Sequence, residues 1–200
     1  MAIKFQYNKT SQQALAKQLQ IRERALPTLK NKESALRVEV KKAKDQAAEL
    51  EEKLEKEMGL YDDMMGLWRE FDPSLVKIKD VELTAKKIAG VQTPVLEKIH
   101  FHVSDYNMFE QPVWIPDGIA ILEKLVKLAI EKEVFERKMN LLDFARKKTT
   151  QKVNLYEKVQ IPGFQDAIRK IKRFLEDEEN LSKASQKIVK NKQQNMEVES

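Results

Sequence analysis

The chain has 200 residues, of which 42% are hydrophobic and 34% are charged, and its formal net charge at pH 7 is +5. Five glycines and six prolines are too few for a loop-rich β protein, and the absence of cysteine excludes disulfide bonds and thiolate metal sites. No apolar run approaches the roughly 20 residues of a membrane-spanning helix, and the first residues lack the apolar core of a signal peptide. We therefore expect long helices with charged outer faces and no direct insertion into a membrane.

A heptad pattern occupies the first third of the chain. Residues 8–11 offer capping side chains, and from Leu15 to Phe71 the stripe positions advance by alternating steps of four and three. Fourteen of these seventeen positions are apolar, and so strict a repeat predicts a left-handed coiled coil. We expect one helix over residues 8–71, in which residues 10–71 would span roughly 90 Å. Pro27 should bend this helix or delay its regular start.

The heptad pattern ends in the middle of the chain. After Asp72-Pro73, apolar residues at 75–89 predict a short helix that Gly90 closes. Apolar residues then alternate with polar ones at 99–103, which is typical of a half-buried strand, and residues 112–114 would return as its partner. We therefore predict that residues 72–118 form a short helix and a β-hairpin insert.

A second heptad stripe follows the insert and predicts a coiled-coil helix over residues 119–190, with a frayed polar tail at 191–200. Between Gln160 and Phe164 the stripe gains one extra residue, at Pro162-Gly163, and then resumes its rhythm. This pattern predicts a bend with a one-residue phase shift inside a continuing helix.

Two amphipathic helices separated by a small insert favour a mostly α fold, a long antiparallel two-helix coiled-coil hairpin that forms a single elongated domain over residues 1–200. A compact helical bundle is the alternative, but it needs a break near every twenty residues. The two heptad stripes would meet in a seam between the helices. The polar residues of this seam are expected to fix register and pairing, and they are Arg22, Glu33, Lys132 and Arg146.

No sequence motif indicates catalysis or cofactor binding. There is no glycine-rich phosphate loop or nucleophile elbow, and His100 and His102 lack a third metal ligand nearby. An acidic run at residues 49–57 is typical of a solvated helix face. Basic clusters at 146–152 and 169–173 would suit nucleic acid, but acidic runs alternate with them, and salt bridges explain them equally well. We therefore predict no catalytic, cofactor or metal site.

Two stretches resemble a known family over roughly residues 8–190. LPTLKNKESALRVEVKKAK in the first helix and ARKKTTQKVNLYEKVQIPGFQDAIRKIKRFLEDEE in the second are similar to the D subunit of the V-type (archaeal and bacterial A-type) rotary ATPases. The family run is basic-basic-Val-Asn, a Glu and then Ile-Pro. This chain departs from it at Gln151-Lys152 and Leu155-Tyr156. The resemblance makes partner-contact candidates of Lys148, Lys152, Val153, Asn154, Glu157, Ile161 and Pro162 in the motif, and of Phe101, Val103 and Trp114 in the insert.

The resemblance implies a central stalk without catalytic residues of its own, peripheral to the inner face of the cell membrane. Its implied partners are the catalytic and non-catalytic head subunits, the small F subunit of the stalk and the adapter on the membrane ring. The stalk would couple ATP hydrolysis or synthesis to proton or sodium transport. A coiled-coil scaffold or tether and a nucleic-acid-binding rod remain alternatives, although a scaffold does not explain the Val-Asn and Ile-Pro run.

Overall fold

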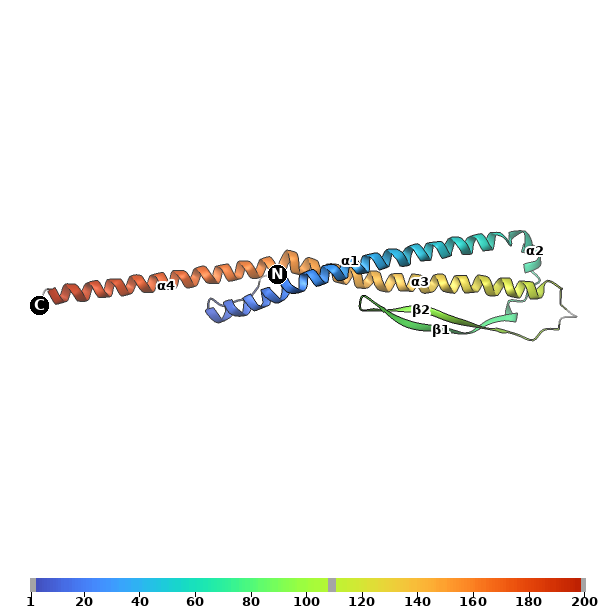
Figure 1. The fold of residues 1–200 in the computed structure, drawn as a ribbon, viewed down its shortest axis with the longest axis horizontal. Coiled ribbons are helices and arrows are strands. Elements are labelled where there is room, and N and C mark those ends of the chain that lie inside the picture. The colour runs from blue at the N-terminus through green and yellow to red at the C-terminus, as the bar shows by residue number, and fades with distance from the viewer. Residues whose placement is uncertain (1–2, 108–110, 199–200) are drawn as a thin grey trace. The chain divides into compact units, whose positions relative to one another are not determined.

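The structure is a computed structural model and describes residues 3–107 and 111–198 (Figure 1). It is mostly helical, with long helices and one two-stranded β-hairpin, as the sequence predicts. Residues up to Asn31 and those from Thr149 onward form one compact unit, and Lys32–Lys148 form another. We call them the terminal unit and the central unit and describe each by itself.

Helix α1, Lys9–Gly59, is capped by Asn8, whose Oδ1 accepts a hydrogen bond of 2.7 Å from the Ser11 N–H. It runs through Pro27, so this proline does not delay its start. The prediction that the helix continues to Phe71 is wrong. Gly59 ends it, and a 3-10 turn at Asp62–Met64 and the short helix α2, Met65–Trp68, follow. Glycine costs about 1 kcal/mol in a helix interior, which explains the break.

The predicted short helix at residues 75–89 is also wrong. These residues form strand β1, Val76–Ile88, which pairs antiparallel with β2, Val91–Val103. The turn between the strands consists of Ala89 and Gly90, whose φ angles of 47° and 82° are typical of a two-residue hairpin. A Cβ added to Gly90 would lie 3.4 Å from Lys32 Nζ, so this turn lies beside α1.

The strand predicted at residues 99–103 is confirmed as the end of β2, but its predicted partner at 112–114 is not a strand. Those residues lead into helix α3, Ile115–Leu155, which begins before the predicted residue 119. Pro116 is compatible with this earlier start, because the first turn of a helix needs no N–H donors. In the described residues the sheet therefore contains β1 and β2 only.

The C-terminal helix continues beyond α3 without leaving helical structure. Tyr156–Gln160 form a π-helical turn, here called the π turn, and α4 follows over Ile161–Val198. The frayed tail predicted from residue 191 is wrong up to Val198, because lysine and glutamine are good helix formers. Residues 199–200 of that predicted tail lie outside the described residues.

The predicted seam is confirmed along the first stripe, where every position from Leu15 to Phe71 is buried or half-buried. On the second stripe it is confirmed only as far as Ile171, because the predicted positions from Phe174 to Ile188 are exposed. In the central unit, Lys124 Nζ lies 2.7 Å from Glu57 Oε2 and Lys132 Nζ lies 2.6 Å from Glu51 Oε1. The residue number rises along α3 as it falls along α1, so the helices are antiparallel there. In the terminal unit, Leu15 packs with Phe164, Ala167 and Ile171.

Candidate functional site: the helix seam and the π turn

The π turn supplies the one extra residue that the sequence predicts, but at Tyr156–Gln160 and not at Pro162-Gly163. The Ile161 N–H donates to the Tyr156 C=O, five residues earlier, so the turn accommodates one residue more than an α-helical turn. Pro162 has no N–H, and its ring would collide with the carbonyl of Lys158 in a regular α-helix. The helix nevertheless continues from the π turn into α4, which includes both Pro162 and Gly163. The predicted phase shift inside a continuing helix is therefore confirmed.

Arg22 of α1 lies opposite this turn. Its Nε donates to Gln160 Oε1 at 2.6 Å, and one terminal nitrogen donates to the Gln18 C=O at 2.9 Å and to Gln18 Oε1 at 2.6 Å. The guanidinium carbon also lies 4.6 Å from the centre of the Phe164 ring and 5.8 Å from that of Tyr156. A hydrogen bond to a charged group contributes about 1.5–3 kcal/mol and a cation–π contact about 0.5–1 kcal/mol.

The motif candidates occupy different environments. Val153 is buried in the seam, Ile161 is half-buried, and Asn154 and Pro162 are exposed. These four belong to the terminal unit and lie around the π turn.

The charged candidates of the motif each have a neighbour. Glu157 pairs with Lys30 of α1 at 2.6 Å, and Lys152 Nζ lies 5.8 Å from the centre of the Tyr156 ring. Lys148 belongs to the central unit, where its Nζ lies 4.3 Å from the centre of the Phe144 ring. The motif thus combines seam residues with charged side chains on the exposed faces. Sequence reasoning singled out Arg22 but missed its partner Gln160, because nothing in the sequence shows which glutamine faces an arginine.

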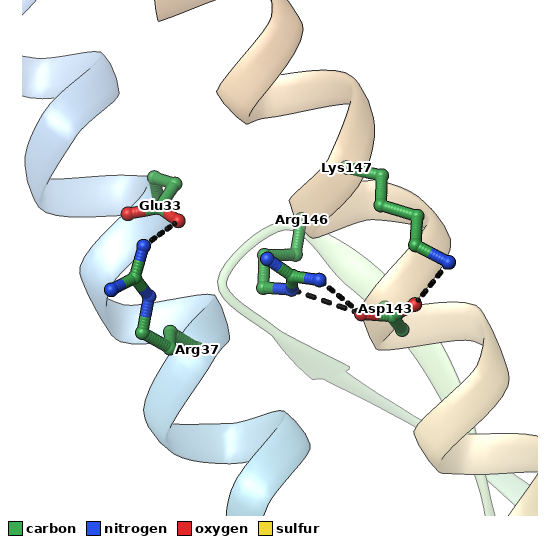
Figure 2. Close-up of polar contacts among 5 residues, drawn as sticks. All are labelled: Glu33, Arg37, Asp143, Arg146 and Lys147. Carbon is green, nitrogen blue, oxygen red and sulfur yellow. Dashed lines mark hydrogen bonds and ion pairs between the residues drawn. The ribbon is translucent and has the colours of Figure 1, made fainter.

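Polar groups in the central unit pair where the sequence predicts register-fixing residues. Lys132 contacts Glu51 across the helices and Glu136 at 3.7 Å on its own helix, and the hydrogen bond to Glu51 raises the pKa of Lys132. Figure 2 shows Arg37 reaching Glu33 on α1, with an N–O distance of 2.8 Å, and Arg146 and Lys147 on either side of Asp143 on α3.

The carboxylate of Asp143 accepts hydrogen bonds from Lys147 and from Arg146, and these bonds lower the pKa of Asp143. A carboxyl with a lowered folded-state pKa stabilises the fold above its unfolded-state pKa and loses this contribution as pH falls through the folded-state value. We expect Asp143→Asn to cost about 0.5–1 kcal/mol at pH 7. The difference from wild type should shrink below roughly pH 4. Urea unfolding at pH 7 and pH 3 measures it, with the exposed Asp45→Asn as control. An equal difference at both pH values would contradict this assignment.

The insert candidates separate in the structure. Phe101 and Val103 lie on β2, and Phe101 lines a groove of about 490 Å³ between the hairpin and α3. A second groove of about 530 Å³ is lined by apolar residues of β1, including Val81 and Leu83, and by Ile130 and Val134 of α3. Both grooves therefore lie between the hairpin and α3.

Trp114 lies off the hairpin, in an aromatic cluster. Its ring centre is 5.5 Å from that of Trp68 and 5.8 Å from that of Phe71, and a Cβ on Gly118 would approach its ring to 2.7 Å. Its buried indole N–H has no hydrogen-bond partner among the described residues. Trp114 therefore packs with the base of the insert, and a contact with a partner stays a prediction for all three insert residues.

Two other kinds of site find no support in the described residues. Within residues 3–107 and 111–198, no group of three or more His, Cys, Asp or Glu side chains is arranged to hold a metal ion. His100 contacts Glu82 of the opposite strand at 2.8 Å. None of the helices in the described ranges has the length and apolar character needed to cross a membrane.

Comparison with known proteins gives a consistent result. The V-type ATP synthase D subunit of Borreliella burgdorferi is 30% identical over 177 residues, covering 86% of this chain and 87% of the relative. Proteins of the same name from Chlamydia muridarum and Chlamydia caviae are 29% and 31% identical, covering 96% and 88% of this chain and 97% and 86% of the relatives. The family model of the ATP synthase D subunit matches residues 11–191. The chain therefore belongs to the ATP synthase D subunit family.

Proposed function

We propose that this chain is the central rotor shaft of a V-type ATP synthase and carries torque between ATP chemistry in the head and ion movement through the membrane ring. The observation that carries the proposal is the family match over residues 11–191, together with relatives named as V-type ATP synthase D subunits. In this proposal ATP is hydrolysed or made by other subunits, and the ion is a proton or sodium. The complex holds the chain at the inner face of the cell membrane.

The seam supports a role in transmitting torque. Buried apolar side chains line it in each unit, and cross-helix ion pairs such as Lys30–Glu157 and Lys132–Glu51 link the antiparallel helices. Exposed ion pairs are individually weak and screened by salt, so charged outer faces suit contacts that form and break as a shaft turns.

The distal half of α4 supports insertion into a partner. Leu181, Ile188 and Val189 are 70%, 59% and 55% exposed, whereas the apolar stripe is buried as far as Ile171. An amphipathic helix that leaves this stripe uncovered is suited to packing against another protein. We propose that the head subunits cover it.

The basic clusters give less support to a function in nucleic-acid binding. Many of their side chains already pair with acids on the same helix, as Arg169 and Lys170 do with Asp166, and Lys172 does with Glu176. Such pairs leave fewer free cations for a phosphate backbone.

Affinity capture of the tagged full-length chain at moderate salt tests the proposal. We expect the large ATPase head subunits, the small F subunit of the stalk and the ring adapter to be recovered together. Recovery of RNA or DNA with a steep salt dependence would favour the nucleic-acid-binding rod. Self-association without ATPase subunits would favour the scaffold.

We propose that the insert contacts a partner in the complex, through Phe101 and Val103 on β2 and the groove beside Leu83. Excising residues 77–102 and joining the ends with a glycine-rich linker should change ATP turnover or assembly. Leu83→Asp tests the groove alone, because this side chain is 46% exposed and should tolerate a charge. Lys86→Ala on the same strand is the matched control. Normal assembly and turnover in both the excision and the Leu83 variant would refute a role for the insert.

A further inference from the structure

The residues that precede helix α1 pack against the terminal unit as a short segment, here called the N-terminal strap (residues 3–7). Half-buried Ile3 and Phe5 alternate with exposed Lys4 and Gln6, as in a strand with one covered face. Ile3 and Phe5 pack against the buried apolar cluster of this unit. The strap therefore adds a third segment of chain to the two helices.

The strap lies along α4 in a nearly extended conformation. At one end, a Cβ added to Gly163 would lie 3.0 Å from Ile3 Cδ1, and at the other end the ring centre of Tyr7 lies 4.9 Å from that of Phe174. Residues 163–174 of a helix rise by about 16 Å, and residues 3–7 span about 13 Å when extended. The strap therefore runs in the same chain direction as α4, over about three of its turns.

The sequence of α4 provides an apolar face for this additional neighbour. Along the seam, Leu15 of α1 packs against stripe residues of α4 such as Ala167 and Ile171. Ile168 and Leu175 lie next to stripe positions and pack against the same cluster. A single helical partner requires only the narrow stripe, so the wider apolar face indicates that α4 packs against both α1 and the strap.

Gly163 leaves the space that Ile3 occupies. Glycine is unfavourable in a helix interior compared with alanine, so its presence within α4 calls for a compensating contact. Its backbone does not have the positive φ angle that would require glycine. A Cβ at this position would approach Ile3 more closely than the ordinary carbon–carbon contact of about 3.5–4.0 Å. The contact with Ile3 therefore accounts for the glycine.

Hydrogen bonds attach the other end of the strap to the first turn of α1. The Gln6 N–H donates to Ser11 Oγ at 3.3 Å, and the Asn8 N–H donates to the Gln6 C=O at 3.0 Å. The strap thus contacts both helices. Because the terminal unit consists of two separate segments of the chain, noncovalent contacts of this kind hold its helices together.

We propose that the N-terminal strap is a latch that fastens α1 to α4 in the terminal unit, with Gly163 as the seat that receives Ile3. The side chains of the strap hold α4, and its hydrogen bonds hold the start of α1. The latch is a property of the chain alone. Its consequence, that α1 and α4 turn together when torque is applied, rests on the proposed function.

Hydrogen exchange followed by mass spectrometry tests the fastening. Deleting residues 2–7 from the otherwise unchanged chain removes the strap but keeps the capping Asn8. Amides at residues 12–22 of α1 should then exchange on the order of tenfold faster, because the apolar contacts of the strap are lost. Amides at residues 36–50, in the central unit, are the control and should not change. Unchanged exchange at residues 12–22, or equal acceleration in both segments, would overturn the proposal.

A substitution at Gly163 tests the seat. Chymotrypsin must take an aromatic side chain into its own pocket, so release of the peptides that end at Phe5 or Tyr7 reports how often the strap leaves α4. Gly163→Leu places a side chain where Ile3 lies and should accelerate this release on the order of tenfold, which corresponds to about 1.4 kcal/mol of overpacking. Gly59→Leu is the matched control and should have no effect, because a Cβ there meets no described atom within 4 Å.

A compensating substitution distinguishes loss of the seat from general loosening. Adding Ile3→Ala to Gly163→Leu makes room for the new side chain and should slow the release relative to Gly163→Leu alone. If Gly163→Leu left the release unchanged, or if Ile3→Ala accelerated it further, the seat would be refuted. Both measurements use the isolated chain, so their failure leaves the proposed function standing, and failure of the affinity capture leaves this inference standing.

Discussion

Replacing Leu142 with alanine is expected to lower the free energy of unfolding by about 2–5 kcal/mol. Leu142 of α3 has no solvent exposure and occupies the predicted stripe, so its truncation removes packed methyl groups and leaves a cavity in the seam of the central unit. Urea unfolding followed by helical circular dichroism measures the loss.

The neighbouring residue provides the matched control. Leu141 is 44% exposed, and Leu141→Ala should change the free energy of unfolding by less than about 1 kcal/mol. Both variants remove the same atoms from the same helix one residue apart. Equal losses would mean that residue 142 is not part of a packed seam, and the stripe would then not define the core.

Ending the chain after Asn180 is expected to remove most of the coupling between ATP turnover and ion transport in the assembled complex, with little effect on unfolding of the isolated chain. The deleted segment carries the exposed Leu181 and Ile188, whereas the packed cluster of the terminal unit extends only to Leu175. The truncated variant should retain its N-terminal residues, because Ile3 and Phe5 pack against that cluster. Proton or sodium uptake per ATP hydrolysed in vesicles containing the complex is the measurement.

A full-length variant distinguishes the effect of the apolar face of distal α4 from the effect of helix length. Leu181→Lys with Ile188→Lys keeps the helix but removes its apolar stripe, and we expect the same loss of coupling. Lys183→Ala with Lys187→Ala changes the charge of the same segment and should retain coupling. Full coupling in the chain that ends at Asn180 would refute the proposed contact between distal α4 and the head.

The sequence predicted the seam well because a seven-residue repeat has few structural solutions. Leu36, Ala43 and Leu142 are buried as their stripe positions require, and the phase shift before Phe164 became the π turn. The same repeat gave a wrong prediction for the end of α1. Tyr61 and Trp68 keep the spacing and remain half-buried, but short turns carry them after Gly59.

The insert was harder to predict because its strands are irregular. Register shifts between Ile78 and Asp80 and between Glu82 and Leu83 break the apolar alternation of β1, so its residues resemble a helix face. Ala89-Gly90 also lacks the Asn-Gly signature of a hairpin turn. Pairs such as Arg22–Gln160 could not be predicted from the sequence. Each helix carries several basic and amide side chains, and only the three-dimensional structure shows which of them face each other.

Single-molecule rotation tests the shaft most directly. One cysteine introduced at Gln92, exposed beside the hairpin turn, can carry a bead while the catalytic head is fixed to a surface. We expect ATP to drive the bead in one direction, and rotation to stop when ATP is exhausted. A bead that stays fixed to the head while ATP hydrolysis continues would contradict the proposal that this chain is the rotor.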